Sequence, residues 1–152
     1  MGTHIVSIGE ALVDMIEVED GSEPRYLAAW GGSPFNVAVG AARLGSPAEF
    51  AGSFSSDALG SKLLGFLREQ GVGVDLCSSH DDVYTTIAMT SFVNAEPHYA
   101  FYANPASYGK LTAAIATRQQ IASAAVVHSG SLAVVEDSTF EAVQESFHAT
   151  SG

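Results

Sequence analysis

The sequence predicts an α/β fold with a largely parallel sheet, on two observations. Short apolar segments alternate along the chain with segments of helical periodicity, which is the order typical of parallel sheets covered by helices. The chain has 152 residues, of which 47% are hydrophobic and 15% charged, so it can bury a core as one domain. It contains no internal repeat, low-complexity tract or linker, and we expect a single globular unit.

The first third of the chain predicts three strands and a helix. HIVSIG (4–9) is short and apolar like a buried strand, and ALVDMIEV (11–18) alternates enough to be a second strand. EDGSEP (19–24) has the composition of a turn, and YLAAW (26–30) predicts a third strand. The alanine-rich stretch 34–44 predicts the helix.

The middle of the chain continues this alternation. AEFAGSF (48–54) predicts a strand, and residues 57–70 place their leucines on one side of a helix that ends before Gly71. VGVDLCSS (72–79) predicts the next strand. Its cysteine, Cys77, is expected to be a small buried apolar side chain.

The last third predicts a hairpin and further α/β elements. TTIAMTSFV (85–93) and HYAFYAN (98–104) are rich in β-branched and aromatic residues and are joined by a short turn, as in an antiparallel hairpin. Residues 111–124 predict a helix, and AAVVHSG (124–130) predicts a buried strand. A final helix is expected to open at Ser138, which has Glu141 at the spacing of a capping box.

The C-terminal region is unusual for this fold class. A strand such as 124–130 normally lies inside a parallel sheet and is followed by further strands. Only one predicted helix follows it here. We therefore expect a sequence that has been cut, with a sheet edge that is open or covered by another chain.

Charge and composition exclude several classes of function. Seventeen acidic residues against six basic ones give a formal net charge of −11, without the clustered cations that nucleic-acid binding requires. No apolar run approaches the roughly 18–20 residues of a membrane span, and the N-terminus lacks the basic start of a signal peptide. A single cysteine suits a reducing compartment. We expect a cytoplasmic protein with neither nucleic acid nor membrane as a partner.

The stretch WGGSPFNVAVGAARLG (30–45) carries the strongest local signals. Ser33 followed by Pro34 is typical of a helix N-cap and first helical residue, and Gly45 fits the C-terminal end of the helix. These residues bracket the predicted helix on both sides.

The two glycines ahead of this helix allow two interpretations. Gly31 and Gly32 lack a Cβ, so the backbone there can turn sharply or let a ligand approach closely. Asn36 can both donate and accept hydrogen bonds, which suits hydroxyl groups better than a formal charge does. The stretch is either a tight turn before a core helix or a binding turn. Neither G-x-G-x-x-G nor G-x-x-x-x-G-K-[ST] is present.

Other chemistry has no support in the sequence. The five histidines show no helical metal-ligand spacing and no cysteine partner, so no metal site is predicted. No G-x-S-x-G elbow occurs, which argues against a hydrolase.

The run GGSPFNVAVGAARLG (31–45) resembles the first sequence signature of the PfkB-type, or ribokinase-like, carbohydrate kinases. Segments 9–18, 51–72, 98–108 and 126–135 resemble further elements of fructokinase-like members, so the likeness extends over essentially the whole chain. It implies a three-layer α/β/α fold with a mainly parallel sheet and a small β-sheet lid.

The resemblance also implies that residues 1–152 are the N-terminal half of such a domain. Lid segments are expected at about 14–33 and 84–108, with the α/β core in the remainder. The family's nucleotide site and catalytic base belong to its C-terminal half, around a Gly-Ala-Gly-Asp motif that this chain lacks. ATP and Mg²⁺ are thus expected to act in the complete enzyme, and no catalytic residue is assigned here.

By position, the family's sugar contacts fall on five residues. Asp14 would accept hydrogen bonds from two sugar hydroxyls, Gly31, Gly32 and Asn36 would hold ring hydroxyls, and Phe101 would reach the sugar from the lid. The alternatives are a solvent-facing carboxylate for Asp14, a helix-start residue for Asn36, and a packing or dimer contact for Phe101.

The sequence departs from the family pattern in two places. Ala103 follows the Phe-Tyr pair where fructokinase-like and ketogluconate-kinase-like relatives usually carry an arginine, which favours a neutral sugar over a sugar acid. The family's Gly-x-Asp-x-x-Gly element begins Ser55-Ser56-Asp57 here, without its first glycine although Gly60 is in place, so we expect Asp57 to be structural.

Two classes of function follow. The first is a kinase that transfers a phosphoryl group from ATP to a hydroxyl of a fructose-like sugar, with this chain supplying the sugar-binding and lid half. The second is a non-catalytic sugar-binding or dimerisation module derived from a sugar kinase. In either class we expect a homodimer, formed through the lid strands or the exposed sheet edge.

Overall fold

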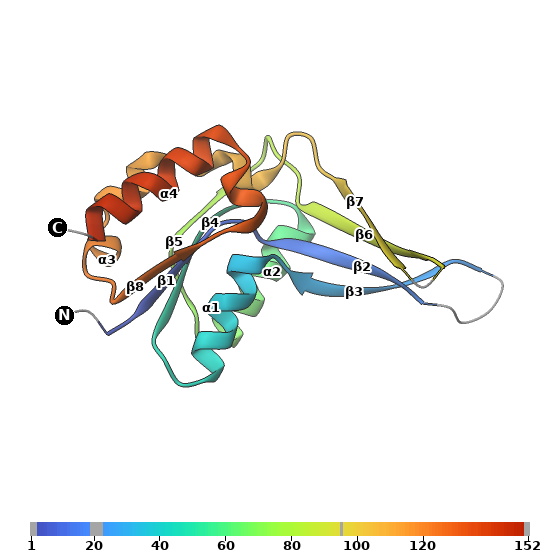
Figure 1. Ribbon diagram of the computed structural model, residues 1–152, viewed down its shortest axis with the longest axis horizontal. Coiled ribbons are helices and arrows are strands. Elements are labelled where there is room, and N and C mark those ends of the chain that lie inside the picture. The colour runs from blue at the N-terminus through green and yellow to red at the C-terminus, as the bar shows by residue number, and fades with distance from the viewer. Residues whose placement is uncertain (1–2, 19–22, 95, 151–152) are drawn as a thin grey trace.

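A computed structural model describes residues 3–18, 23–94 and 96–150, which form two four-stranded sheets (Figure 1). Sheet A has the order β5-β4-β1-β8 and is parallel throughout. Its strands are β1 (Ile5–Ile8), β4 (Ala48–Ser55), β5 (Gly73–His80) and β8 (Val126–Ser129). The predicted α/β fold with a mainly parallel sheet is confirmed.

Sheet B has the order β3-β2-β6-β7 and extends away from sheet A (Figure 1). Its strands are β2 (Leu12–Val18), β3 (Arg25–Gly31), β6 (Thr86–Val93) and β7 (Glu96–Tyr102). The predicted β6–β7 hairpin is antiparallel, while β2 pairs with β6 in parallel and with β3 in antiparallel fashion. Most of the predicted turn at 19–24 lies outside the described residues.

Helical elements cover both faces of sheet A and complete three layers (Figure 1). One face packs against α1 (Ser33–Arg43) and α2 (Ala58–Glu69), with the rings of Phe35, Phe50 and Phe54 at the centre of the core. The other face packs against the 3₁₀ helices η1 (Ser107–Lys110) and η2 (Ala113–Thr117), and against α3 (Gln119–Ala122) and α4 (Asp137–Thr150).

The predicted helix over 111–124 is wrong. The segment forms two short pieces, η2 and α3, separated by an extended Arg118. The Thr117 hydroxyl donates to the Ala114 carbonyl, a local hydrogen bond that competes with continued helix. Ile121 is fully buried, so its packing against the core fixes the position of α3 although the helix is short.

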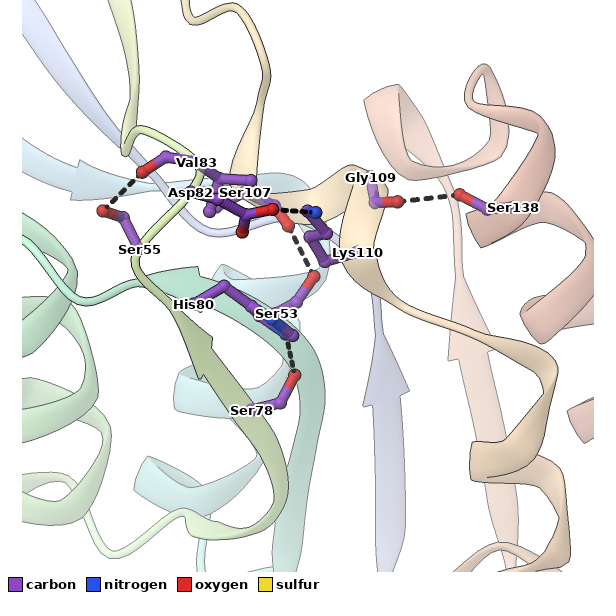
Figure 2. Close-up of polar contacts among 10 residues, drawn as sticks. All are labelled: Ser53, Ser55, Ser78, His80, Asp82, Val83, Ser107, Gly109, Lys110 and Ser138. Atoms are coloured by element: carbon purple, nitrogen blue, oxygen red, sulfur yellow. Dashed lines mark hydrogen bonds and ion pairs between the residues drawn. The ribbon is translucent and has the colours of Figure 1, made fainter.

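Both serine caps predicted from the sequence are also wrong. At α1 the N-cap position is Gly32, and the amide of Ser33 donates instead to the carboxylate of Glu10. At α4 the helix begins two residues earlier than a cap at Ser138 requires, because the Phe140 amide already donates to the Glu136 carbonyl. The Ser138 hydroxyl donates to the Gly109 carbonyl and joins α4 to η1 (Figure 2).

The serines of β4 tie the root of the β6–β7 hairpin to sheet A, as Figure 2 shows. The Ser55 hydroxyl donates to the Val83 carbonyl (2.9 Å), just before β6. The Ser53 hydroxyl donates to the Ser107 carbonyl (2.6 Å), just after β7. An ion pair of Lys110 with Asp82 joins the same two chain segments. The hairpin is thus anchored at both of its ends.

The edges of sheet A are β5 and β8. No strand among the described residues pairs with the outer side of β8, and Val126 there is 52% exposed, as expected of an open edge. Cys77 on β5 is only partly buried, and its thiol donates to the Phe50 carbonyl. No helix in the described part of the chain is long and apolar enough to cross a membrane.

Candidate sugar site

A cavity of about 670 Å³ lies where sheet B meets the N-terminus of α1. Four of the five residues predicted to contact a sugar line it, namely Asp14, Gly32, Asn36 and Phe101. They come from β2, α1 with its preceding turn, and β7, which are far apart in the sequence. Gly31 is not in the lining but lies next to the carboxylate of Asp14.

Asp14 lies in a row of small residues on one face of sheet B. Its cross-strand neighbours are Ala29 on β3 and Ala88 on β6, and Ala88 in turn faces Phe101 on β7. Directly opposed residues share a face of a sheet. The two alanines leave the carboxylate uncovered on the cavity side, with the Phe101 ring on the same face.

The charge of Asp14 has no compensating partner within the described residues. The structure gives its carboxylate no hydrogen bond and no ion pair there, and partial burial raises the pKa of this carboxyl above its ordinary value. A half-buried acceptor of this kind is best satisfied by donors from a ligand, and the hydroxyl groups of a neutral sugar are such donors.

The two glycines serve different purposes at this site. A Cβ at Gly31 would lie 2.1 Å from Oδ2 of Asp14, so only glycine leaves room for the carboxylate. Gly32 has φ +108°, and a Cβ there would lie 2.5 Å from the Glu10 carbonyl oxygen. Gly31 therefore accommodates Asp14, and Gly32 makes the turn into α1.

Asn36 is in the first turn of α1, where its own amide donates to the Gly32 carbonyl (2.9 Å). Its side chain is exposed and lines the cavity. No hydrogen bond of that side-chain amide to another described residue is present, which leaves its donor and acceptor for a ligand. The partial positive charge of the helix N-terminus reinforces the affinity of this end for oxygen atoms.

The outer wall of the cavity is aromatic. Phe101 and Tyr99 are two residues apart on β7, so both side chains are on the same face of sheet B. Phe101 is 53% exposed and Tyr99 is 62% exposed, and both line the cavity. Such rings can cover the apolar C–H face of a sugar while its hydroxyls meet the polar wall.

Sequence reasoning missed Glu10, the cavity residues of η3 and one of the aromatic residues. Ser131 and Leu132 line the cavity from η3 (Ser131–Val134), the 3₁₀ helix after β8. Glu10 lines it from the turn between β1 and β2. Ser131 follows the carboxyl end of a parallel strand, where ligand sites of α/β folds gather, and Tyr99 shares the alternation of Phe101. Both were open to prediction on those grounds.

The predicted structural role of Asp57 fits its contacts. Asp57 is the N-cap of α2 and accepts a hydrogen bond from the Gly60 amide (2.8 Å). It also accepts from both the amide and the hydroxyl of Thr85, next to β6. Asp57 therefore joins α2 to sheet B, and it does not line the cavity.

The described residues do not form a metal site. Within residues 3–18, 23–94 and 96–150, no group of three or more His, Cys, Asp or Glu side chains could hold a metal ion.

Comparison with known proteins gives one family. Residues 2–151 match the family described as pfkB family carbohydrate kinase. Fructokinase-2 of Solanum habrochaites is 35% identical over 136 residues, which cover 86% of this chain and 42% of that protein. This chain thus spans less than half the length of that relative.

Solved structures agree with this result. The fructokinase of Xylella fastidiosa superimposes with a TM-score of 0.91 at 28% identity, over 99% of this chain and 48% of that one. A second crystal structure of the Xylella fructokinase, with bound ATP, gives a TM-score of 0.90 at 27% identity, over 99% of this chain and 49% of that one. These likenesses confirm the expected three-layer fold.

Proposed function

We propose, from the premise that this chain belongs to the pfkB family of carbohydrate kinases, that it forms the sugar-binding and lid half of an ATP-dependent kinase for a fructose-like sugar. The observation that carries the proposal is the half-buried Asp14 carboxylate, which faces the cavity without a partner among the described residues. The fructokinases among the relatives support a ketose as the substrate class.

The contribution of this half is positioning. Phosphoryl transfer depends on holding the acceptor hydroxyl in line with the phosphoryl group, and on keeping water away from it. Asp14 and Asn36 would orient the sugar, and sheet B with Phe101 would cover it. ATP and Mg²⁺ are proposed for the complete enzyme only. Position 103 is alanine rather than the arginine that could pair with a sugar-acid carboxylate, which supports a neutral sugar as the substrate.

The test is calorimetric titration of the chain with D-fructose, D-ribose and 2-keto-3-deoxygluconate. We expect saturable binding of fructose, weakened about 10- to 100-fold in Asp14→Asn, since a neutral amide replaces a charged acceptor. Affinity should also fall as pH is lowered through the Asp14 pKa, which lies above its ordinary value. Asp75→Asn, at an exposed carboxylate on β5, should bind as the wild type does. Equal affinity in wild type and Asp14→Asn would contradict the proposal.

A second candidate is a sugar-binding or dimerisation module without catalysis. It is favoured by the exposed apolar side chains of sheet B, such as Leu27 and Tyr99, which suit a protein interface. One experiment distinguishes the two candidates. The protein is expressed from its complete reading frame, and its mass and its ATP-dependent phosphorylation of fructose are measured. A mass near twice that of this chain, with turnover, supports the kinase. A mass of 15.8 kDa without turnover supports the module.

We further propose a homodimer through the cavity-side face of sheet B, whose exposed apolar side chains include Ile16, Leu27 and Tyr99. Leu27→Asp should yield monomers in analytical ultracentrifugation at concentrations where the wild type is dimeric. Leu27 is 62% exposed, so the change should leave the fold intact. Leu44→Asp, at an 88% exposed leucine beyond α1, is the control and should remain dimeric. A monomeric wild type at high micromolar concentration would refute the dimer.

A further inference from the structure

Glu10 is the one charged side chain that is buried within the described part of the chain. It is in the turn between β1 and β2, and its exposed fraction is 0%. Isolated carboxylates are rarely buried, because the loss of hydration must be offset by hydrogen bonds. Its burial therefore indicates that the Glu10 carboxylate is hydrogen-bonded to other parts of the chain.

The two carboxylate oxygens of Glu10 each accept one backbone hydrogen bond. Oε1 accepts from the amide of Ser33 (3.2 Å), at the start of α1. Oε2 accepts from the amide of Ala133 (3.0 Å), within η3. These amides are 100 positions apart in the sequence. Among the residues that the structure describes, Glu10 is thus the only side chain with hydrogen bonds to both of these segments.

The same two segments both line the cavity. Gly32 and Ser33 line it from the start of α1, and Ser131 and Leu132 line it from η3. The main chain of Glu10 also contacts the first wall closely, since a Cβ at Gly32 would lie 2.5 Å from the Glu10 carbonyl oxygen. Glu10 therefore contacts the Gly32–Ser33 wall with both its main chain and its side chain.

We propose that Glu10 is a positioning residue for the sugar: its carboxylate holds the Gly32–Ser33 turn and the Ser131–Ala133 turn at the separation that a bound sugar requires. This inference rests on the proposed sugar-binding function. Two acceptor oxygens match two amide donors, and no neutral side chain of the same length offers this. In Glu10→Gln, one oxygen becomes an NH₂ group that faces an amide donor, so one wall is released.

The experiment combines sugar titration with amide hydrogen exchange on the whole chain. Glu10→Gln should bind D-fructose at least tenfold more weakly at a temperature where circular dichroism shows it folded. Exchange at the Ser33 or Ala133 amide should be faster, while that of the core strand β4 stays unchanged. Glu141→Gln, at an exposed carboxylate on α4, is the matched control and should alter neither. Glu10→Asp, one methylene shorter but still charged, should show an intermediate affinity.

The possible results separate this inference from the proposed function. A wild-type chain that binds no sugar overturns both. Sugar binding in the wild type with equal affinity in folded Glu10→Gln overturns only the positioning role. If neither Glu10→Gln nor Glu10→Asp folds, Glu10 serves the fold alone and the positioning role is likewise overturned.

Discussion

Replacing Asp57 by alanine is expected to lower the free energy of unfolding by about 2–4 kcal/mol. The change removes the N-cap of α2, which is worth roughly 1 kcal/mol, and leaves the buried amide and hydroxyl of Thr85 without their acceptor. Chemical denaturation measures the loss. Asp57→Asn should recover part of it, because asparagine is also a good N-cap, whereas Asp75→Ala, at an exposed side chain of β5, should cost less than about 0.5 kcal/mol.

The same carboxylate gives the stability a defined dependence on pH. Partial burial opposes the charge of Asp57, but hydrogen bonds from the Gly60 amide and from Thr85 outweigh it and lower the pKa from 3.8 to about 2. A lowered pKa in the folded state stabilises the fold above the unfolded pKa, and this contribution is lost as pH falls toward the folded pKa. The stability difference between wild type and Asp57→Ala should therefore shrink between about pH 4 and pH 2. A difference that is constant over this range would contradict the assigned contacts.

Gly31→Ala should abolish most sugar binding while leaving the chain folded. The new Cβ would overlap Oδ2 of Asp14, at 2.1 Å, so the carboxylate must move from its present place. The affinity for fructose should fall about 10- to 100-fold, as in Asp14→Asn, because both changes remove the same charged acceptor. Gly31 is within β3, where alanine is otherwise tolerated, so the free energy of unfolding should change by only about 1 kcal/mol.

The matched control for this prediction is Gly40→Ala. Gly40 is inside α1, and apart from its chain neighbours and the helix's own backbone nothing lies within 4 Å of where a Cβ would be. Alanine there should stabilise the helix by up to about 1 kcal/mol and leave sugar affinity unchanged. Unchanged affinity in Gly31→Ala would show that the position of the Asp14 carboxylate does not matter for binding.

Most strands and the two long helices of the first half were predictable, because their signals are local. The leucines of 57–70 repeat at helical spacing, and α2 forms there with Gly71 at φ +76° after its end. The segment 111–124 lacks a comparable signal, since its apolar residues are mainly alanines and the Thr117 hydroxyl bonds to nearby backbone. Packing of Ile121 decides its structure, and the sequence does not display that contact.

The pairing within sheet B was only half predictable. The β6–β7 hairpin joins neighbouring segments and was expected from composition. The parallel pairing of β2 with β6 joins segments about 70 residues apart, and no local pattern encodes it. That pairing brings Asp14 and Phe101 onto one face, so the shape of the site depends on the non-local contact.

The candidate site was predictable from the family resemblance where it involves Asp14, Gly32, Asn36 and Phe101, which the structure brings to one cavity. Glu10 was not predictable, because both its partners are backbone amides and no residue type marks an amide that needs an acceptor. The predicted N-cap at Ser33 was wrong for a related reason. Gly32 is the N-cap, and the Ser33 amide donates to Glu10, which is distant in the sequence.

The most direct test of the central claim is a ¹H–¹⁵N correlation spectrum of the labelled chain during titration with D-fructose. We expect saturable shift changes for the amides of Asp14, Gly32, Asn36 and Phe101, which line one cavity. The amides of β5, which is the edge of sheet A opposite β8, should keep their chemical shifts. Shifts confined to other segments, or none at saturating sugar, would contradict the assignment of this cavity as the sugar site.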